Sequence, residues 1–201
     1  MKTLFLDVAS NQGSLAVIQE DQVLLKTIDH RISDSDLVPM VEAMLKDASC
    51  SYTDLTHLAC VTGPGGFTSL RVGVAFANAL ASQLKIPVAG VHLSDLYAAR
   101  VRQSDFLWLH STKKHEIFIR GFGSFVKDFS EAQDREIETI VPTLPEKSFW
   151  TGELIPEHLQ LIESRGMQRL PLTPLEEGLP SFLKTLVYSN DLLQPWYGRK
   201  W

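Results

Sequence analysis

The stretch VTGPGGFTSLRVGVAFANALASQL, Val61–Leu84, joins a short apolar strand to a long helix through a glycine-proline turn. The helical part carries a single charged side chain, Arg71. Gly73, Ala77 and Ala81 are four residues apart, so they lie on one face of the helix. A soluble helix that is apolar all round must be covered on all sides. We therefore expect this helix to pack against more than its own sheet.

The glycine-proline turn consists of Gly63, Pro64, Gly65 and Gly66. Glycines before a helix can bring backbone N–H groups close to a phosphate. The turn lacks the Lys-Ser or Lys-Thr pair of a Walker loop, however, and it does not fit the G-x-G-x-x-G pattern. We interpret it as a structural turn that aims the helix, with Gly65 and Gly66 as weak candidates for a cofactor contact.

A second helix is predicted over residues 35–48, where apolar residues recur at spacings of three and four. Two interpretations of the helix pair stay open, a central core and a protein interface, and we favour the interface because small residues and methionines suit close, adaptable contacts. Ala75, Ala79 and Ser82 form a second line of small residues on the longer helix. The predicted interface residues are Leu37, Met40, Val41, Met44, Leu45, Leu70, Gly73, Val74, Ala77 and Ala81.

The first half of the chain reads as an α/β unit. Its apolar runs and turns predict a three-strand meander, followed by strands that alternate with helices. Strands separated by single helices imply parallel pairing with helices covering the sheet. The predicted strands are Lys2–Ala9, Ser14–Gln19, Gln22–Asp29, Leu55–Thr62 and Ile86–Leu93, and a helix over Ser94–Gln103 ends this half.

After residue 103 the same pattern restarts in a shorter form. We predict two lobes, residues 1–103 and 104–201, with the final tail returning to the first lobe. The elements predicted in the second lobe are strands at Phe106–Ser111, His115–Gly123, Val126–Phe129 and Ser148–Leu154 and helices at Pro156–Ser164 and Leu175–Tyr188.

The composition is that of an ordinary globular protein, with 44% apolar residues and a formal net charge of −5. Runs of basic residues have at most two members, as at Lys113-Lys114, so the chain is not expected to bind nucleic acid strongly by itself. No apolar stretch is long enough to span a membrane. Cys50 and Cys60 lack a C-x-x-C spacing, and we expect reduced thiols in a cytoplasmic protein.

Patterns that carry catalysis are mostly absent. Asp7 ends the first predicted strand, where some folds hold Mg²⁺, but a metal–phosphate site wants a second carboxylate and a phosphate loop. His110 and Ser111 stand at the corresponding position of the second lobe. The histidines show no metal-ligand spacing, so we expect no catalytic residue, metal or cofactor of its own. The alternative is an ATP-dependent phosphotransferase that uses Asp7 and the glycine turn.

Several segments resemble the TsaB/YeaZ family. They are LFLDVASNQGSLAV, GPGGFTSLRVGVAFANALA, IPVAGVHLSDLYA and the closing PWYGRKW, together with HRISDSDLVPMVEAML. The most specific is the string G-P-G-x-F-T-x-L-R-x-G from Gly63 to Gly73. The similarity covers residues 1–100 well and the rest thinly.

The resemblance implies a two-lobe acetate kinase/actin/Hsp70-like, ribonuclease H-like fold with a shortened second lobe. It also implies a non-catalytic scaffold subunit in the formation of threonylcarbamoyladenosine (t6A) in tRNA. Such a subunit pairs with a TsaD-like transferase through the two first-lobe helices, and a TsaE-like ATPase joins the pair. ATP and metal would be used by these partners, tRNA would be met only through the complex, and the chain alone could form a homodimer.

Two departures from the family pattern stand out. Gly66 and Ser69 replace the serine and glycine that the family usually carries in the glycine-turn motif. The second-lobe segment HSTKKHEIF, His110–Phe118, lacks the usual aspartate and tyrosine. These changes argue against a nucleotide or substrate contact by the second lobe, but they leave the helix pair untouched.

Overall fold

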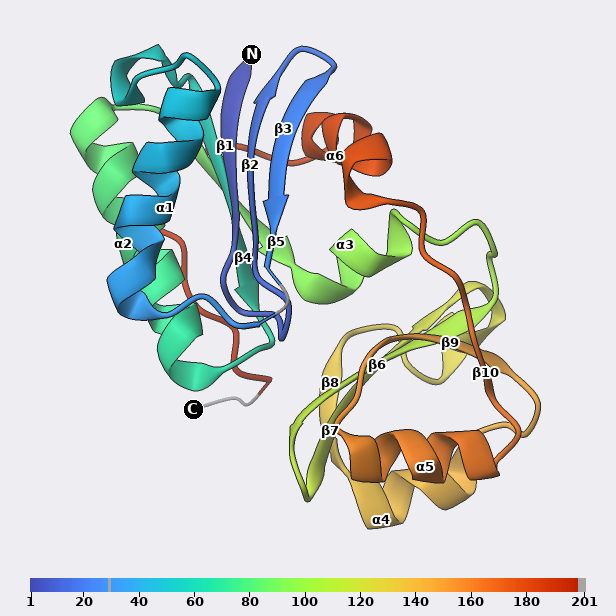
Figure 1. Cartoon of the computed structure of the whole chain (residues 1–201). Coiled ribbons are helices and arrows are strands. Elements are labelled where there is room, and N and C mark those ends of the chain that lie inside the picture. The colour runs from blue at the N-terminus through green and yellow to red at the C-terminus, as the bar shows by residue number, and fades with distance from the viewer. Residues whose placement is uncertain (29, 199–201) are drawn as a thin grey trace. The chain divides into compact units, whose positions relative to one another are not determined.

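The computed structural model describes residues 1–28 and 30–198, which form two compact units (Figure 1). Unit 1 combines Met1–Leu93 with Leu175–Tyr197, and unit 2 is built on Ser94–Pro174. Asp29, at the end of the third predicted strand, lies outside the described residues, as do the last three residues of the closing PWYGRKW segment.

Unit 1 contains a five-stranded mixed sheet in the order β3-β2-β1-β4-β5. The three strands of the predicted meander pair antiparallel, and β4 and β5 add parallel to β1. Residues of β1, β2 and β4 are almost all buried, as their continuous apolar runs predict. The strands are β1 (Lys2–Asp7), β2 (Ser14–Gln19), β3 (Gln22–Thr27), β4 (His57–Gly63) and β5 (Val88–His92).

Three helices cover this sheet. Helices α1 (Asp34–Asp47) and α2 (Phe67–Leu84) lie on one face, and α6 (Leu175–Lys184) lies on the other (Figure 1). Helix α2 contacts β4, β1 and β5, whereas α1 contacts β2 and α2. A short 3-10 helix, Tyr52–Asp54, precedes β4.

Unit 2 repeats the plan of unit 1 in a reduced form. Its sheet has the order β10-β9-β6-β7-β8, in which β6, β7 and β8 form a meander and β9 and β10 add parallel. The strands are β6 (Phe106–Lys113), β7 (Glu116–Phe122), β8 (Gln133–Glu136), β9 (Phe149–Glu153) and β10 (Gln168–Arg169). The helices are α3 (Leu93–Ala98), α4 (Ile137–Ile140) and α5 (Pro156–Ser164), with 3-10 turns at Gly123–Lys127 and Val141–Thr143.

The third strand of unit 2 lies elsewhere than predicted. The segment predicted as a strand, Val126–Phe129, begins inside the 3-10 turn Gly123–Lys127, and the strand proper is β8. Gly123 has a positive φ of 61°, and Ser124 N–H donates to Asp105 Oδ1 at 2.6 Å. These two features fold the segment into a turn, which meets β7 where Gly121 N–H donates to the Phe129 carbonyl at 2.8 Å.

The division between the units also differs from the predicted boundary at residue 103. It falls after Leu93, because side chains that follow Leu93 bond within unit 2. Arg120 Nη1 donates to Asp95 Oδ1 at 2.6 Å, and Arg100 Nε donates to the Thr173 carbonyl at 2.9 Å.

The helix predicted over Leu175–Tyr188 of the second lobe belongs instead to unit 1, to which the chain returns at Leu175, and it ends earlier than predicted, at Lys184. The chain then continues along unit 1 in an extended form. Val88 and Ser189 exchange backbone hydrogen bonds of 2.8 and 3.0 Å. Residues 189–197, which we call the tail, therefore begin by pairing with β5, the edge strand of the first sheet.

Candidate functional site

The buried side of α2 is made of small and medium apolar residues that pack on the sheet of the same unit. A Cβ added at Gly73 would overlap Val8 Cγ2 and lie 3.9 Å from Cys60 Sγ. Ala77 is fully buried and Ala81 is 6% exposed. The four-residue spacing of these small side chains therefore lets α2 approach β1 and β4 closely.

This packing accounts for the ten residues predicted as a partner interface. Met40 is half-buried and the other nine are buried within this chain, namely Leu37, Val41, Met44, Leu45, Leu70, Gly73, Val74, Ala77 and Ala81. They are core residues of unit 1 and do not form the accessible patch expected at these positions. The apolar spacing identifies a packed row correctly, but the partner of that row is the chain's own sheet.

The opposite side of α2 is open to solvent. Phe67, Arg71, Ala75 and Ala79 are exposed at four-residue spacing, and Phe67 is 51% exposed. Beside this row run the half-buried side chains of Val72, Phe76 and Leu80. We call these seven residues the α2 outer face. It contains Ala75 and Ala79 of the second small-residue line and only one charge.

Helix α1 adds less apolar surface. Val38 is 42% exposed, Ala43 is exposed and Met40 is half-buried. Charged residues, among them Glu42 and Lys46, share its solvent side. Of the two helices, α2 therefore presents the less polar exposed surface, which is the kind of surface that marks protein–protein contacts.

The glycine-proline turn is filled by other parts of unit 1. A Cβ at Gly63 would overlap the Trp196 carbonyl oxygen, and one at Gly65 would overlap the Ala9 carbonyl oxygen. Gly66 N–H donates to that same Ala9 oxygen at 3.1 Å. At Gly66 a Cβ would meet the Arg31 guanidinium. The glycines thus make room for the chain itself, and the arrangement is that of a tight strand-to-helix turn.

Asp7 lies at the end of β1, as predicted, and its carboxylate accepts hydrogen bonds from the residues of the turn that follows. Oδ1 accepts the backbone N–H groups of Ala9 and Ser10, each at 3.1 Å, and Oδ2 accepts the Ser10 hydroxyl at 2.6 Å. The side chain is 4% exposed. These bonds explain why the strand ends at Asp7 and the chain turns toward β2.

The tail lies along the flank of α2 and the end of β4. The Asn78 amide bonds to both backbone groups of Leu193, at 3.0 and 2.8 Å, and Trp196 N–H donates to the Thr62 carbonyl at 2.7 Å. The Trp196 ring packs edge-on against His92, with 4.6 Å between ring centroids. Sequence reasoning missed these contacts, because an amide within a helix gives no sign of a backbone partner 115 residues away.

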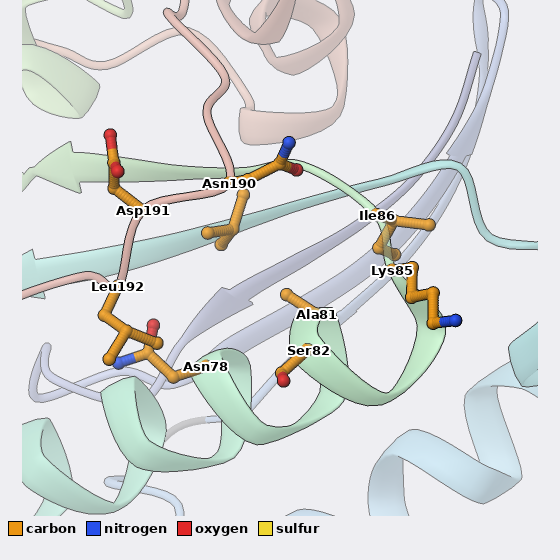
Figure 2. Close-up of a pocket in the computed structure, with 9 residues that line it drawn as sticks. Asn78, Ala81, Ser82, Lys85, Ile86, Asn190, Asp191 and Leu192 are labelled. Carbon is orange, nitrogen blue, oxygen red and sulfur yellow. The ribbon is translucent and has the colours of Figure 1, made fainter.

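A pocket of about 310 Å³ remains where the tail crosses α2 (Figure 2). Asn78, Ser82 and Lys85 line it from the helix, and residues 190–192 line it from the tail. Figure 2 shows Leu192 beside Asn78 at one end, while the ends of Lys85 and Asp191 point away from each other. The charged groups therefore do not converge on one ligand position.

In unit 2, His110 and Ser111 are fully buried near the end of β6. His110 Nδ1 lies 3.8 Å from Glu153 Oε2, and the Tyr97 hydroxyl donates to Glu153 Oε1 at 2.9 Å. Ser111 Oγ accepts the Ile155 N–H at 3.0 Å. This position thus holds a buried polar network that ties β6 to β9 and α3, in contrast to the short turn around Asp7.

Within residues 1–28 and 30–198, no three His, Cys, Asp or Glu side chains gather closely enough to hold a metal ion. Over the same residues, no helix combines the length and apolar character needed to cross a membrane.

The chain matches known proteins in sequence. The family model TsaD, tRNA N6-adenosine threonylcarbamoyltransferase, matches residues 28–141, which is more than half of the chain. The tRNA threonylcarbamoyladenosine biosynthesis protein TsaB of Bacillus subtilis is 30% identical over 109 residues, covering 53% of this chain and 48% of that protein. TsaB of Escherichia coli is 33% identical over 92 residues, with coverage of 45% and 40%. The matched region therefore spans half or less of these curated relatives.

The fold matches over almost its whole length. YeaZ from Pseudomonas aeruginosa superposes with a TM-score of 0.70 at 19% identity, covering 97% of this chain and 99% of that one. The two units accordingly form the two lobes of an acetate kinase/actin/Hsp70-like, ribonuclease H-like fold. By sequence and fold, the chain belongs to the family described by the TsaD model and, within it, to the TsaB/YeaZ proteins.

Proposed function

We propose that this chain is a non-catalytic subunit in tRNA threonylcarbamoyladenosine formation and that it pairs with a TsaD-like transferase. The observation that carries the proposal is the α2 outer face, a row of exposed small and aromatic side chains with one charge. Interface cores are depleted in charged residues other than arginine and enriched in aromatic residues. A partner helix can approach Ala75 and Ala79 closely, as packed helices do at small residues.

The contacts around Asp7 and the glycine turn support a non-catalytic role. The Asp7 carboxylate already accepts three hydrogen bonds from its turn, and the turn glycines adjoin Trp196 and Ala9. A phosphotransferase that used these groups would have to move the tail and break the Asp7 turn. In the proposed complex the partners supply the ATP and metal chemistry, a TsaE-like ATPase joins the pair, and tRNA is met through the complex.

The test is reconstitution with the TsaD-like and TsaE-like proteins of the same organism. We expect the chain and the TsaD-like protein to co-elute as one particle in size-exclusion chromatography. Modified adenosine, measured in tRNA by mass spectrometry, should form only when this chain is present. Full modification in the absence of this chain would refute the proposal. Separate elution at about 10 μM would also refute it, because a complex with a dissociation constant of about 1 μM or lower is largely formed at that concentration.

The isolated chain should also use the α2 outer face. Because exposed apolar surface tends to become covered, we expect weak self-pairing through the α2 outer face. The TsaD-like protein should then convert the homodimer to the mixed dimer, which light scattering would detect as a change in mass.

A further inference from the structure

The one charge on the α2 outer face is held in a fixed position by two aromatic rings. The Arg71 guanidinium carbon lies 3.9 Å from the centroid of the Phe67 ring and 5.6 Å from that of Tyr197. Arg71 Nε donates to the Tyr197 hydroxyl at 2.8 Å. These contacts orient the guanidinium, and among residues 1–28 and 30–198 its hydrogen bond is made by Nε, which leaves Nη1 and Nη2 for an acceptor on a partner.

Tyr197 is itself anchored, although it belongs to the tail. Its neighbour Trp196 bonds to the Thr62 carbonyl and packs on His92. The rings of Phe67 and Tyr197 are 5.3 Å apart. The tail therefore supplies one wall of the arginine site, and the cost of ordering the arginine side chain is met before any partner binds.

Arg71 has no acidic partner in the part of the chain that the structure describes. None of the ion pairs within 4.0 Å among those residues includes it. In water this isolated charge is well solvated. If a partner covers the α2 outer face, the same charge loses water and must be paired, because a buried unpaired guanidinium is strongly unfavourable.

We infer that Arg71 binds a carboxylate of the TsaD-like partner, and that Tyr197 positions it for a two-pronged contact through Nη1 and Nη2. This inference rests on the proposed function. A protein carboxylate fits better than an RNA phosphate, because the other six residues of the α2 outer face are uncharged and the chain carries a net charge of −5. The nearest cation at the start of α2 is Arg31, whose guanidinium lies against Gly66 and bonds to Asn11 Oδ1 at 2.9 Å. RNA surfaces are bound by clustered cations, whereas a lone arginine among apolar residues is common at protein interfaces.

The experiment measures the affinity of the full-length chain for the TsaD-like protein by calorimetry. We expect Arg71→Met to weaken binding by at least about 30-fold, which is the lower end of the usual effect of removing one partner of a covered charge pair. Arg71→Lys should recover only part of the loss, because lysine lacks the planar fork. Tyr197→Phe should cost a smaller factor, and Arg102→Met, at an exposed arginine of unit 2, should cost nothing.

Salt provides a readout that a purely structural role would not change. The wild-type affinity should fall between 50 and 500 mM salt, and the fall should be smaller in Arg71→Met and in Arg71→Gln. The urea midpoints of these variants should equal that of the wild type.

Each contrary result has its own meaning. If the wild type binds and Arg71→Met binds equally well, the carboxylate contact is refuted while the proposed pairing stands. If the variant pairs normally but the complex loses affinity for tRNA, the occupant is a phosphate and the inference is refuted. If the wild type does not bind the TsaD-like protein at all, the proposed function itself fails.

Discussion

Small residues lie on both sides of helix α2, but their surroundings are opposite. Ala77 is fully buried against the sheet, whereas Ala79, two positions along, is exposed. On the buried side small residues allow the helix to approach the strands, and on the open side they leave room for a second polypeptide. A stripe of small residues thus identifies close packing and leaves open whether the neighbour belongs to the same chain.

The largest difference between the two sides should appear in folding. Replacing Gly73 with leucine places a side chain where Val8 and Cys60 already lie, so we expect the free energy of unfolding to fall by about 3 kcal/mol or more. Urea denaturation followed by circular dichroism measures this. Ala75→Leu, on the open side, is the matched control and should change the free energy by less than about 0.5 kcal/mol. Equal losses at both positions would remove the distinction between the sides.

The next largest difference should appear in association. Ala79→Arg places a charged, bulky group on the α2 outer face, so we expect the affinity for the TsaD-like protein to fall about 10–100-fold, or roughly 1.4–2.8 kcal/mol. The urea midpoint should stay at the wild-type value. Ala99→Arg, at an exposed alanine of unit 2, provides the control. An Ala79→Arg variant that binds as tightly as the wild type would show that the partner uses another surface.

The reactivity of the cysteine thiols tests the buried side of α2, with a smaller expected effect. Cys60 is fully buried beneath α2, and burial raises the pKa of its thiol well above the usual range. The native protein should therefore react with a thiol reagent only at Cys50, and unfolding should release the second thiol. Gly73→Leu, by disturbing the packing, should speed the reaction of Cys60.

Cys50 gives the pH dependence of the same experiment. Partial burial raises the pKa of this thiol, against the opposing charge of Lys2. A raised pKa means that less thiolate is present at a given pH, so the labelling rate of Cys50 should still be rising above about pH 9. A rate that levels off near pH 8 would contradict this direction.

The sheets of the two units extend the comparison to the whole chain. Both have a meander followed by two parallel strands, but α1 and α2 have 14 and 18 residues, whereas α4 and α5 have 4 and 9. Within the part of the chain that the structure describes, a long helix with an open apolar side is therefore found in unit 1 alone. This difference supports placing the partner on unit 1.

The architecture of unit 1 could be predicted because each of its elements is marked by a local sequence pattern. Continuous apolar runs mark β1 and β4, a change of period marks α1, and the glycine-proline turn marks the start of α2. The strand at Val126–Phe129 was wrong because Gly123 and the Asp105 carboxylate form a turn that periodicity does not reveal.

The candidate site was less accessible to sequence reasoning. The side of α2 that faces the sheet depends on the position of Gly73 over Val8, which is a tertiary contact. The apolar rows of the two sides interleave in the sequence, so the ten residues selected were those of the core. The pairing of Arg71 with Tyr197 spans 126 residues, and no local pattern connects them.

The most direct measurement is protection of the α2 outer face when the partner binds. A cysteine placed by Ala79→Cys, in a chain that also carries Cys50→Ser, would be labelled with maleimide with and without the TsaD-like protein. Leu161→Cys, at a 43% exposed position on α5, serves as the control. We predict that labelling at position 79 slows at least tenfold in the complex while labelling at position 161 is unchanged. A complex that forms while position 79 is labelled at its free rate would contradict the assignment of this face.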